Sequence, residues 1–272
     1  MTINTLNPDS TIPDIQSLSD KRHIPIKRVG IRNLCLPAII SDLDSKTQNT
    51  TANWTMTVSL SEKDKGTHMS RFITLLEQYR LKILTPELLH QMALEMLDLL
   101  QSNSGDISLS FPFFMEKTAP VSKVKSLMNY QVEFIVRVNK ESKDEFELIL
   151  QIPVTSLCPC SKAISTYGAH NQRSNITLSI IFKEISDISI SKFIRFAEEE
   201  SSCELWSLLK RPDEKYVTEY AYDHPKFVED LIRDLASRID KNLINISKYK
   251  IEAENFESIH NHSAYAVIEK SV

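Results

Sequence analysis

Apolar and polar residues alternate with a period of two over much of this chain, which is the pattern of strands with one buried face. The segment 54–60 alternates in this way, and the segment 128–138 places four apolar side chains on one face. A polar stretch at 42–52 interrupts the pattern and predicts a loop. The strands predicted on this basis cover residues 29–40, 54–60, 107–116, 128–138, 146–154, 176–182, 246–253 and 264–269.

Helical spacing or a helix-start signal marks some of the remaining ordered segments. Val228, Leu231, Leu235 and Ile239 recur at helical spacing. The run Thr85–Glu87 combines a capping hydroxyl, a proline in the first turn and an acidic residue, which together start a helix. Helices are predicted at 69–79, at 85–100, from 190 through 197, and from Asp223–Pro225 onward with His224 at the start.

Each half of the chain therefore reads strand, strand, helix, helix, strand, strand. Because strands outnumber helical crossovers, we expect an antiparallel sheet with two helices on one face of each half, an α+β class. The expected organisation is an irregular N-terminal arm at 1–25, a first half at 26–140 and a second half at 141–272.

Composition narrows the function without identifying it. The chain has 272 residues, 42% hydrophobic and 25% charged, with a net charge of -4. These values are typical of a globular protein and argue against a general nucleic-acid binder. No apolar run reaches the ~20 residues of a membrane span, and the first residues do not resemble a secretory signal. We therefore expect a cytoplasmic protein with reduced cysteines, in which Cys35 is a small buried hydrophobe.

The pattern Gly-x-His-x-x-Arg occurs twice, in Gly66–Arg71 and in Gly168–Arg173. The repeat predicts equivalent positions at or just before the second strand of each half. A histidine can act as a base or metal ligand, and an arginine can hold a phosphate. Cys158 and Cys160 precede the second copy and are too close for an easy disulfide, which favours metal ligation or thiol chemistry.

Together these motifs resemble the type IB GTP cyclohydrolase I family, a prokaryotic alternative to the type IA enzyme. The matching segments span nearly the whole chain, and the cysteine–histidine motif is the most specific of them. They are 13–16, 65–72, 156–162, 167–174, 210–219 and 254–262.

The resemblance implies a bimodular tunnelling fold, two antiparallel β-sheet/two-helix halves per subunit, whose subunits form barrels as a homotetramer with active sites at interfaces. It also implies hydrolysis of the guanine imidazole ring of GTP to 7,8-dihydroneopterin triphosphate and formate, the first step of tetrahydrofolate biosynthesis. That reaction needs activated water, which a divalent metal with an open coordination position supplies.

The resemblance places Cys158 and His170 at metal-ligand positions. Glu204 is the expected third ligand and Glu214 its competitor, while Cys160 either supports Cys158 or binds the ion. Thiolate and imidazole ligands favour zinc, although manganese or iron suit a site that contains a carboxylate.

The substrate requires an acceptor for guanine and cations for the triphosphate. Glu219 is the candidate for the guanine anchor. His68 is either a substrate contact from a neighbouring subunit or a packing residue that echoes His170. The family has a functional histidine near 260, for which we prefer His260 over His262, two residues expected to share one face of a strand. The candidate phosphate ligands are Lys65, Arg71, Arg173, Lys210 and Arg211.

Two other functions remain open at this point. In a thiol enzyme of the same fold, Cys158 would attack a nitrile or purine carbon without a metal. A non-catalytic purine-binding or metal-sensing protein would keep the pocket and turn nothing over. Chelation separates the first alternative from a metal enzyme, because only a metal enzyme loses activity with EDTA and recovers with added ion.

Overall fold

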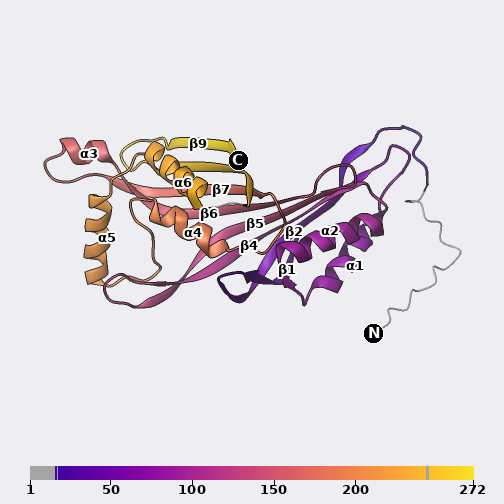
Figure 1. Cartoon of the computed structure of the whole chain (residues 1–272), viewed down its shortest axis with the longest axis horizontal. Coiled ribbons are helices and arrows are strands. Elements are labelled where there is room, and N and C mark those ends of the chain that lie inside the picture. The colour runs from indigo at the N-terminus through magenta and orange to yellow at the C-terminus, as the bar shows by residue number, and fades with distance from the viewer. Residues whose placement is uncertain (1–15, 17, 243–244) are drawn as a thin grey trace.

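The computed structural model describes residue 16, residues 18–242 and residues 245–272 (Figure 1). Most of the expected arm at 1–25 lies outside the described residues, including Pro13, Asp14 and Ile15 of the first matching segment. The remainder forms one nine-stranded sheet with helices packed on it, in the order β3-β1-β2-β4-β5-β6-β7-β8-β9. This arrangement confirms the α+β prediction.

All neighbouring strands are antiparallel except the short β1–β3 pair. Every predicted strand is present, and most run several residues further than the alternation indicated. The strands are β1 (Ile26–Asp42), β2 (Ser45–Leu60), β3 (Ile83–Leu84), β4 (Ser104–Thr118), β5 (Lys125–Asn139), β6 (Glu145–Leu157), β7 (Asn171–Phe182), β8 (Ile246–Asn255) and β9 (Ala264–Ser271).

Two helix pairs cover the same face of the sheet (Figure 1). Helices α1 (Met69–Tyr79) and α2 (Pro86–Leu100) pack on the strands of the first half, and α4 (Ile190–Glu199) and α6 (Val228–Asn242) pack on those of the second. Strand register explains the shared face, because the buried Ile107, Val136 and Phe146 lie directly opposite one another on β4, β5 and β6. One continuous hydrophobic core therefore runs beneath both helix pairs.

The expected boundary at residue 140 falls in the turn between β5 and β6. These two strands pair from Gln131 to Arg137, so the sheet continues across the boundary. The element order repeats on either side of it, with β3, α3 (Pro159–Ile164) and α5 (Arg211–Asp223) as additions. The division into halves stays a prediction.

The loop predicted at 42–52 was wrong, because β2 already begins at Ser45. Its polar side chains make hydrogen bonds to the backbone of β4. The Gln48 side-chain amide accepts from the Phe114 N–H and donates to the Phe114 carbonyl, both at 2.8 Å. Thr50 similarly donates to the Pro112 carbonyl at 2.9 Å. Side-chain hydrogen bonds to the β4 backbone thus hold a polar segment in the sheet.

Two further predictions were wrong. His224 follows the end of α5, a helix that periodicity did not reveal, and α6 begins only at Val228. Cys35 is exposed rather than buried, because β1 turns it away from the helices. Among the described residues, the helices are too short or too polar to cross a bilayer.

Candidate functional site

Cys158 lies where β6 passes into the short helix α3. It is the N-cap residue of that helix, and its sulfur accepts the Ser161 N–H at 3.4 Å. Pro159 occupies the first helical position, where its missing N–H costs nothing. The Ser161 hydroxyl donates to the Cys158 carbonyl at 3.2 Å. These contacts fix the half-buried thiol, whereas Cys160 on the first turn of α3 is exposed.

His170 lies directly before β7, beside Cys158 across the β6–β7 connection. The Cys158 N–H donates to the His170 carbonyl at 3.1 Å, and the His170 N–H donates to the Ser161 hydroxyl at 3.2 Å. The preceding Gly168 has a φ of 141°, a conformation that favours glycine. The structure therefore brings the predicted cysteine and histidine together.

Two residues outside the predicted set orient the imidazole. Nδ1 of His170 donates to Oε1 of Gln172 at 2.9 Å, and Gln172 in turn donates to Glu257 at 3.4 Å. Glu257 also approaches His170 Nδ1 to 3.9 Å from the turn that follows β8. The ring is 14% exposed and the carboxylate 12%. With Nδ1 engaged, Nε2 carries the lone pair that can ligate a cation.

Glu204 lies on a segment that runs along the edge of β6. Thr155 and Cys203 exchange backbone hydrogen bonds at 2.9 and 3.4 Å, and the Leu157 N–H donates to the Ser202 hydroxyl at 3.2 Å. Because this pairing is antiparallel, the chain runs from Ser202 to Glu204 back along β6, away from Cys158. The Glu204 carboxylate, however, pairs with Lys117 at 2.5 Å.

Lys117 is a buried cation between two carboxylates. Its ammonium lies 2.7 Å from Glu198 and 4.9 Å from the ring centre of Trp206. Tyr130 donates its hydroxyl to Glu198 at 2.6 Å. Burial raises the pKa of Glu198, and the Lys117 charge opposes that shift. A buried ion pair is costly to desolvate, so these contacts must satisfy it closely.

Helix α5 carries Glu219 and packs on the cysteine–histidine region. Ala221 on its inner face joins a small core with Leu157 and Cys203, which Ala169 and Val217 extend. Lys162 of α3 also donates to the Tyr222 carbonyl near the C-terminal end of α5.

Glu219 lies on the outer side of α5, not on a strand or loop. Its carboxylate is 60% exposed and pairs with Lys215 at 2.8 Å. It does not contact Cys158 or His170 within the described part of the chain. Its helix is placed against the site, but the Glu219 side chain is not directed at it.

The start of α5 holds Lys210 and Arg211. Asp213 is fully buried there and accepts the N–H groups of Val121, Ser122 and Lys210, each at 2.8 Å, as well as the Ser122 hydroxyl. Burial by itself would raise the pKa of Asp213, but these hydrogen bonds hold it well below the usual range. Both basic side chains are exposed, at the opposite end of the helix from α3.

His260 and His262 lie in the turn between β8 and β9 rather than on a strand. Their exposed rings stack with centres 5.1 Å apart. The same turn supplies Glu257 to His170, so His260 is close in sequence to a side chain that reaches the site. Arg173 on β7 is exposed, three residues after His170.

The two Gly-x-His-x-x-Arg copies are not structurally equivalent. The first follows β2 and places His68 at the N-cap of α1, whereas the second precedes β7. Gly66 also lacks the positive φ of Gly168. Arg71 donates to the Leu99 carbonyl at 2.9 Å, and exposed Lys65 lies just before α1.

Within one chain, the predicted residues thus form two separate groups. Figure 1 places α1 at the opposite end of the sheet from α3 and α5. Among the described residues, no three His, Cys, Asp or Glu side chains already form a set able to hold a metal ion. A cavity of 590 Å³ lies elsewhere, lined in part by Asp44, Phe114 and Arg195, and contains no predicted site residue.

Comparison with known proteins identifies the family. The family model described as type I GTP cyclohydrolase folE2 matches residues 12–266. The chain belongs to this family. The family is FolE2, so the expected assignment to type IB was wrong. The expected enzyme class is confirmed at the level of the family.

Relatives match the FolE2 chain over nearly its whole length. The GTP cyclohydrolase FolE2 of Bordetella petrii is 56% identical over 264 residues, covering 97% of this chain and 98% of the relative. That of Bordetella pertussis is 58% identical with the same coverage. That of Burkholderia mallei is 51% identical over 268 residues, covering 98% of each.

Solved structures support the tunnelling fold. A hyper-thermostable AgUricase mutant superposes with a TM-score of 0.54 at 8% identity, covering 91% of each chain. Urate oxidase from Bacillus sp. TB-90 gives a TM-score of 0.50 at 9% identity, covering 91% of this chain and 100% of the other. At such low identity the likeness concerns the fold alone, and it confirms that part of the prediction.

Proposed function

We propose that this FolE2 protein is a metal-dependent GTP cyclohydrolase I that releases formate from GTP and forms 7,8-dihydroneopterin triphosphate. The observation that carries the proposal is the backbone hydrogen bond that holds Cys158 beside His170 within the most specific motif of the chain. The names of the relatives support GTP as the substrate. We expect the enzyme to act in the cytoplasm.

The donors suit a divalent cation. Cys158 offers a half-buried sulfur, and His170 offers Nε2 on a ring whose other nitrogen is held by Gln172. Glu204 is the proposed third ligand and would exchange its contact with Lys117 for the ion. Glu214 is disfavoured, because it belongs to the first turn of α5, at the far end of that helix from Cys158. Thiolate and imidazole favour zinc, with manganese or iron as alternatives.

When bound, the cation supplies Lewis acidity that makes water nucleophilic at neutral pH. The protein's own residues place the purine so that its imidazole carbon meets that water. Glu219 is the proposed acceptor for the two donors on the guanine edge, which requires it to release Lys215. His260 is the proposed proton carrier, supplied by the same turn as Glu257.

The triphosphate is proposed to contact Lys65, Arg71, Arg173, Lys210 and Arg211, with His68 as a further substrate contact. Lys65, His68 and Arg71 lie near α1, at the opposite end of the sheet from Cys158. They can join one active site only if a second copy of the chain supplies them. This separation supports an oligomer with active sites at interfaces, for which a homotetramer is proposed.

The sheet has edges at which further copies could add. Only Ile39 and Ile40 of β1 pair on that strand's outer side, and β9 is the last strand of the described sheet. Closing such edges between subunits would form the barrels expected of a tunnelling fold and remove exposed backbone groups.

The test measures formate and pterin fluorescence from GTP with purified protein, after EDTA treatment and after zinc or manganese is restored. Loss and recovery of both products support the proposal. Activity that survives chelation would contradict metal dependence and favour Cys158 as a nucleophile. GTP binding without turnover under every condition would contradict the cyclohydrolase assignment and favour a purine-binding protein.

A further inference from the structure

The segment that carries Glu204 is held beside the end of β6, which leads to Cys158, by a few contacts that lie outside the pairing of the nine strands. The segment 200–204 is an added strand-like edge on β6, held there by the Thr155–Cys203 bridge and the Leu157–Ser202 contact. Such a short pairing has few hydrogen bonds of its own, so its position depends on what holds it from the other side.

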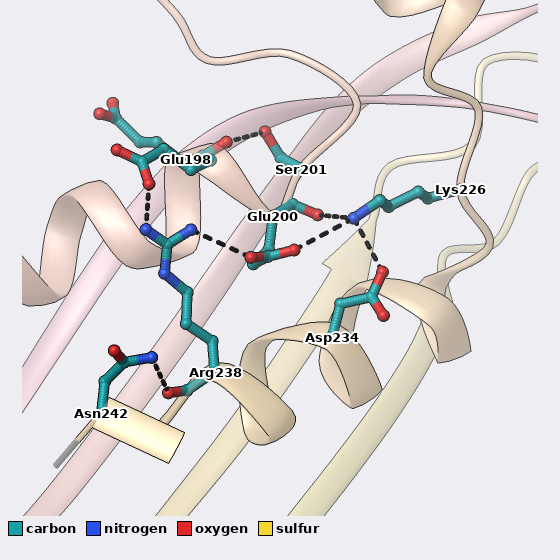
Figure 2. Close-up of polar contacts among 8 residues, drawn as sticks. Glu198, Glu200, Ser201, Lys226, Asp234, Arg238 and Asn242 are labelled. Atoms are coloured by element: carbon teal, nitrogen blue, oxygen red, sulfur yellow. Dashed lines mark hydrogen bonds and ion pairs between the residues drawn. The ribbon is translucent and has the colours of Figure 1, made fainter. Parts of the chain in front are cut away.

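Lys226 contacts both segments at once. Its backbone N–H donates to the carbonyl of Leu157, directly before Cys158, at 3.2 Å. Its ammonium donates to the carbonyl of Glu200 at 2.8 Å (Figure 2). One residue therefore links the end of β6 to the segment that leads to Glu204.

Helix α6 anchors this link. Lys226 pairs with Asp234 at 2.8 Å and with the Glu200 carboxylate at 3.4 Å (Figure 2). Arg238, one turn after Asp234, donates to Glu200 at 3.0 Å and also pairs with Glu199. Lys226 and Glu200 are only 22% and 23% exposed, so water screens these contacts less than it screens a surface ion pair.

We propose that Lys226 is a positioning residue that fixes the distance between the Cys158 and Glu204 segments. The inference rests on the proposed function, which makes both residues ligands of one cation. Ligands that are already held in place bind an ion with less loss of conformational freedom, so loosening the link lowers affinity. Lys226 itself does not touch the ion or the substrate.

The test compares Lys226→Met with Lys270→Met in the full-length protein. Methionine keeps the apolar stem and removes the ammonium. Lys270 is a matched control, because it also pairs with α6, through Asp240 at 2.7 Å, but does not contact either ligand-bearing segment. Zinc and manganese affinities are measured by competition with a chromophoric chelator, together with amide hydrogen exchange at Thr155 and Cys203.

We expect Lys226→Met to weaken cation affinity about 10-fold or more, the range for residues that orient ligands, and to speed exchange at both amides. Lys270→Met should match the wild type in both. Equal affinity and exchange in the two variants would overturn the inference. If Lys226→Met does not fold, Asp234→Asn is used instead, because it removes one of the contacts to Lys226. Asp234→Asn should then weaken cation affinity and speed hydrogen exchange at the Thr155 and Cys203 amides. Unchanged affinity and exchange in Asp234→Asn would overturn the inference.

The exchange measurement separates this inference from the proposed function. If wild-type protein binds neither zinc nor manganese, the metal proposal is contradicted. Amide hydrogen exchange alone would then test whether Lys226 holds the two segments together. Faster exchange at Thr155 and Cys203 only in Lys226→Met supports the link. Unchanged exchange refutes it whatever the metal result.

Discussion

The ring of His170 and the amide of Gln172, two residues apart at the start of β7, form a 2.9 Å hydrogen bond that selects one tautomer of the imidazole. Gln172 is 8% exposed and is itself held by Glu257. A histidine whose Nδ1 donates in this way presents Nε2 as a ligand in a fixed orientation.

Replacing Gln172 by leucine removes that acceptor and retains a side chain of similar size. We expect Gln172→Leu to lower cation affinity roughly 10- to 100-fold, as removal of such orienting partners does. Chelator competition measures the loss. Gln151→Leu is the control, because Gln151 is exposed on the neighbouring strand β6. Equal affinities in the two variants would contradict the role given to Gln172.

The buried Lys117–Glu198 pair predicts a large loss of stability when it is broken. Lys117→Met leaves the Glu198 carboxylate buried without its cation, a change that costs about 3–5 kcal/mol of unfolding free energy. Lys125→Met is the control, since Lys125 pairs with Glu116 at the same 2.7 Å but is 65% exposed. Lys125→Met should lose far less stability than Lys117→Met, because solvent screens an exposed ion pair. Urea unfolding at one protein concentration compares them, and similar losses would refute the prediction.

Asp213 predicts a pH-dependent contribution to stability. Its hydrogen bonds lower the pKa of the folded carboxyl below the unfolded value, so its stabilisation is present above the unfolded pKa and is lost as pH falls through the folded pKa. Asp213→Asn should therefore unfold at lower urea than the wild type at pH 7, and the gap should shrink as the pH falls below about 4. Asp223→Asn, at the other end of α5, should show no such gap. A gap that grows on acidification would reverse the sign and contradict the argument.

Substitution of Glu219 should affect substrate recognition without affecting the stability of the fold. Its exposed pair with Lys215 contributes at most about 1 kcal/mol to folding, so Glu219→Gln should leave the unfolding midpoint nearly unchanged. If its carboxylate anchors guanine, kcat/KM for GTP should fall about 10- to 100-fold, the value of a hydrogen bond to a charged group. Steady-state kinetics measure the effect beside Glu229→Gln on α6. Unchanged kcat/KM would remove Glu219 from the proposed site.

Much of the fold is predictable from the sequence, because period-two alternation marks part of most long strands, a helix-start signal marks α2 and helical spacing marks α6. Helix α5 was missed because it buries only Asp213 and Ala221 and so has little apolar periodicity. Pro212 in its first turn, followed by two acidic residues, was the available signal.

Only the part of the candidate site formed by residues close together in the sequence was predictable. Cys158 and His170 flank one connection, so a local motif identifies both. Glu257 reaches His170 because β8 pairs with β7, and Lys117 reaches Glu204 from a distant strand. Those contacts depend on sheet order, which the spacing of residues in the sequence does not determine.

Formate release from GTP labelled with carbon-13 at the imidazole carbon tests the central claim most directly. We predict that metal-loaded wild-type protein and Cys35→Ala convert the purine signal into labelled formate, followed by nuclear magnetic resonance, while Cys158→Ala leaves GTP intact. Cys35 is an exposed cysteine on β1, outside the proposed site, which makes it a control for Cys158. Persistence of the purine signal with wild-type protein under zinc, manganese and iron, or equal formate release by Cys158→Ala, would contradict the account.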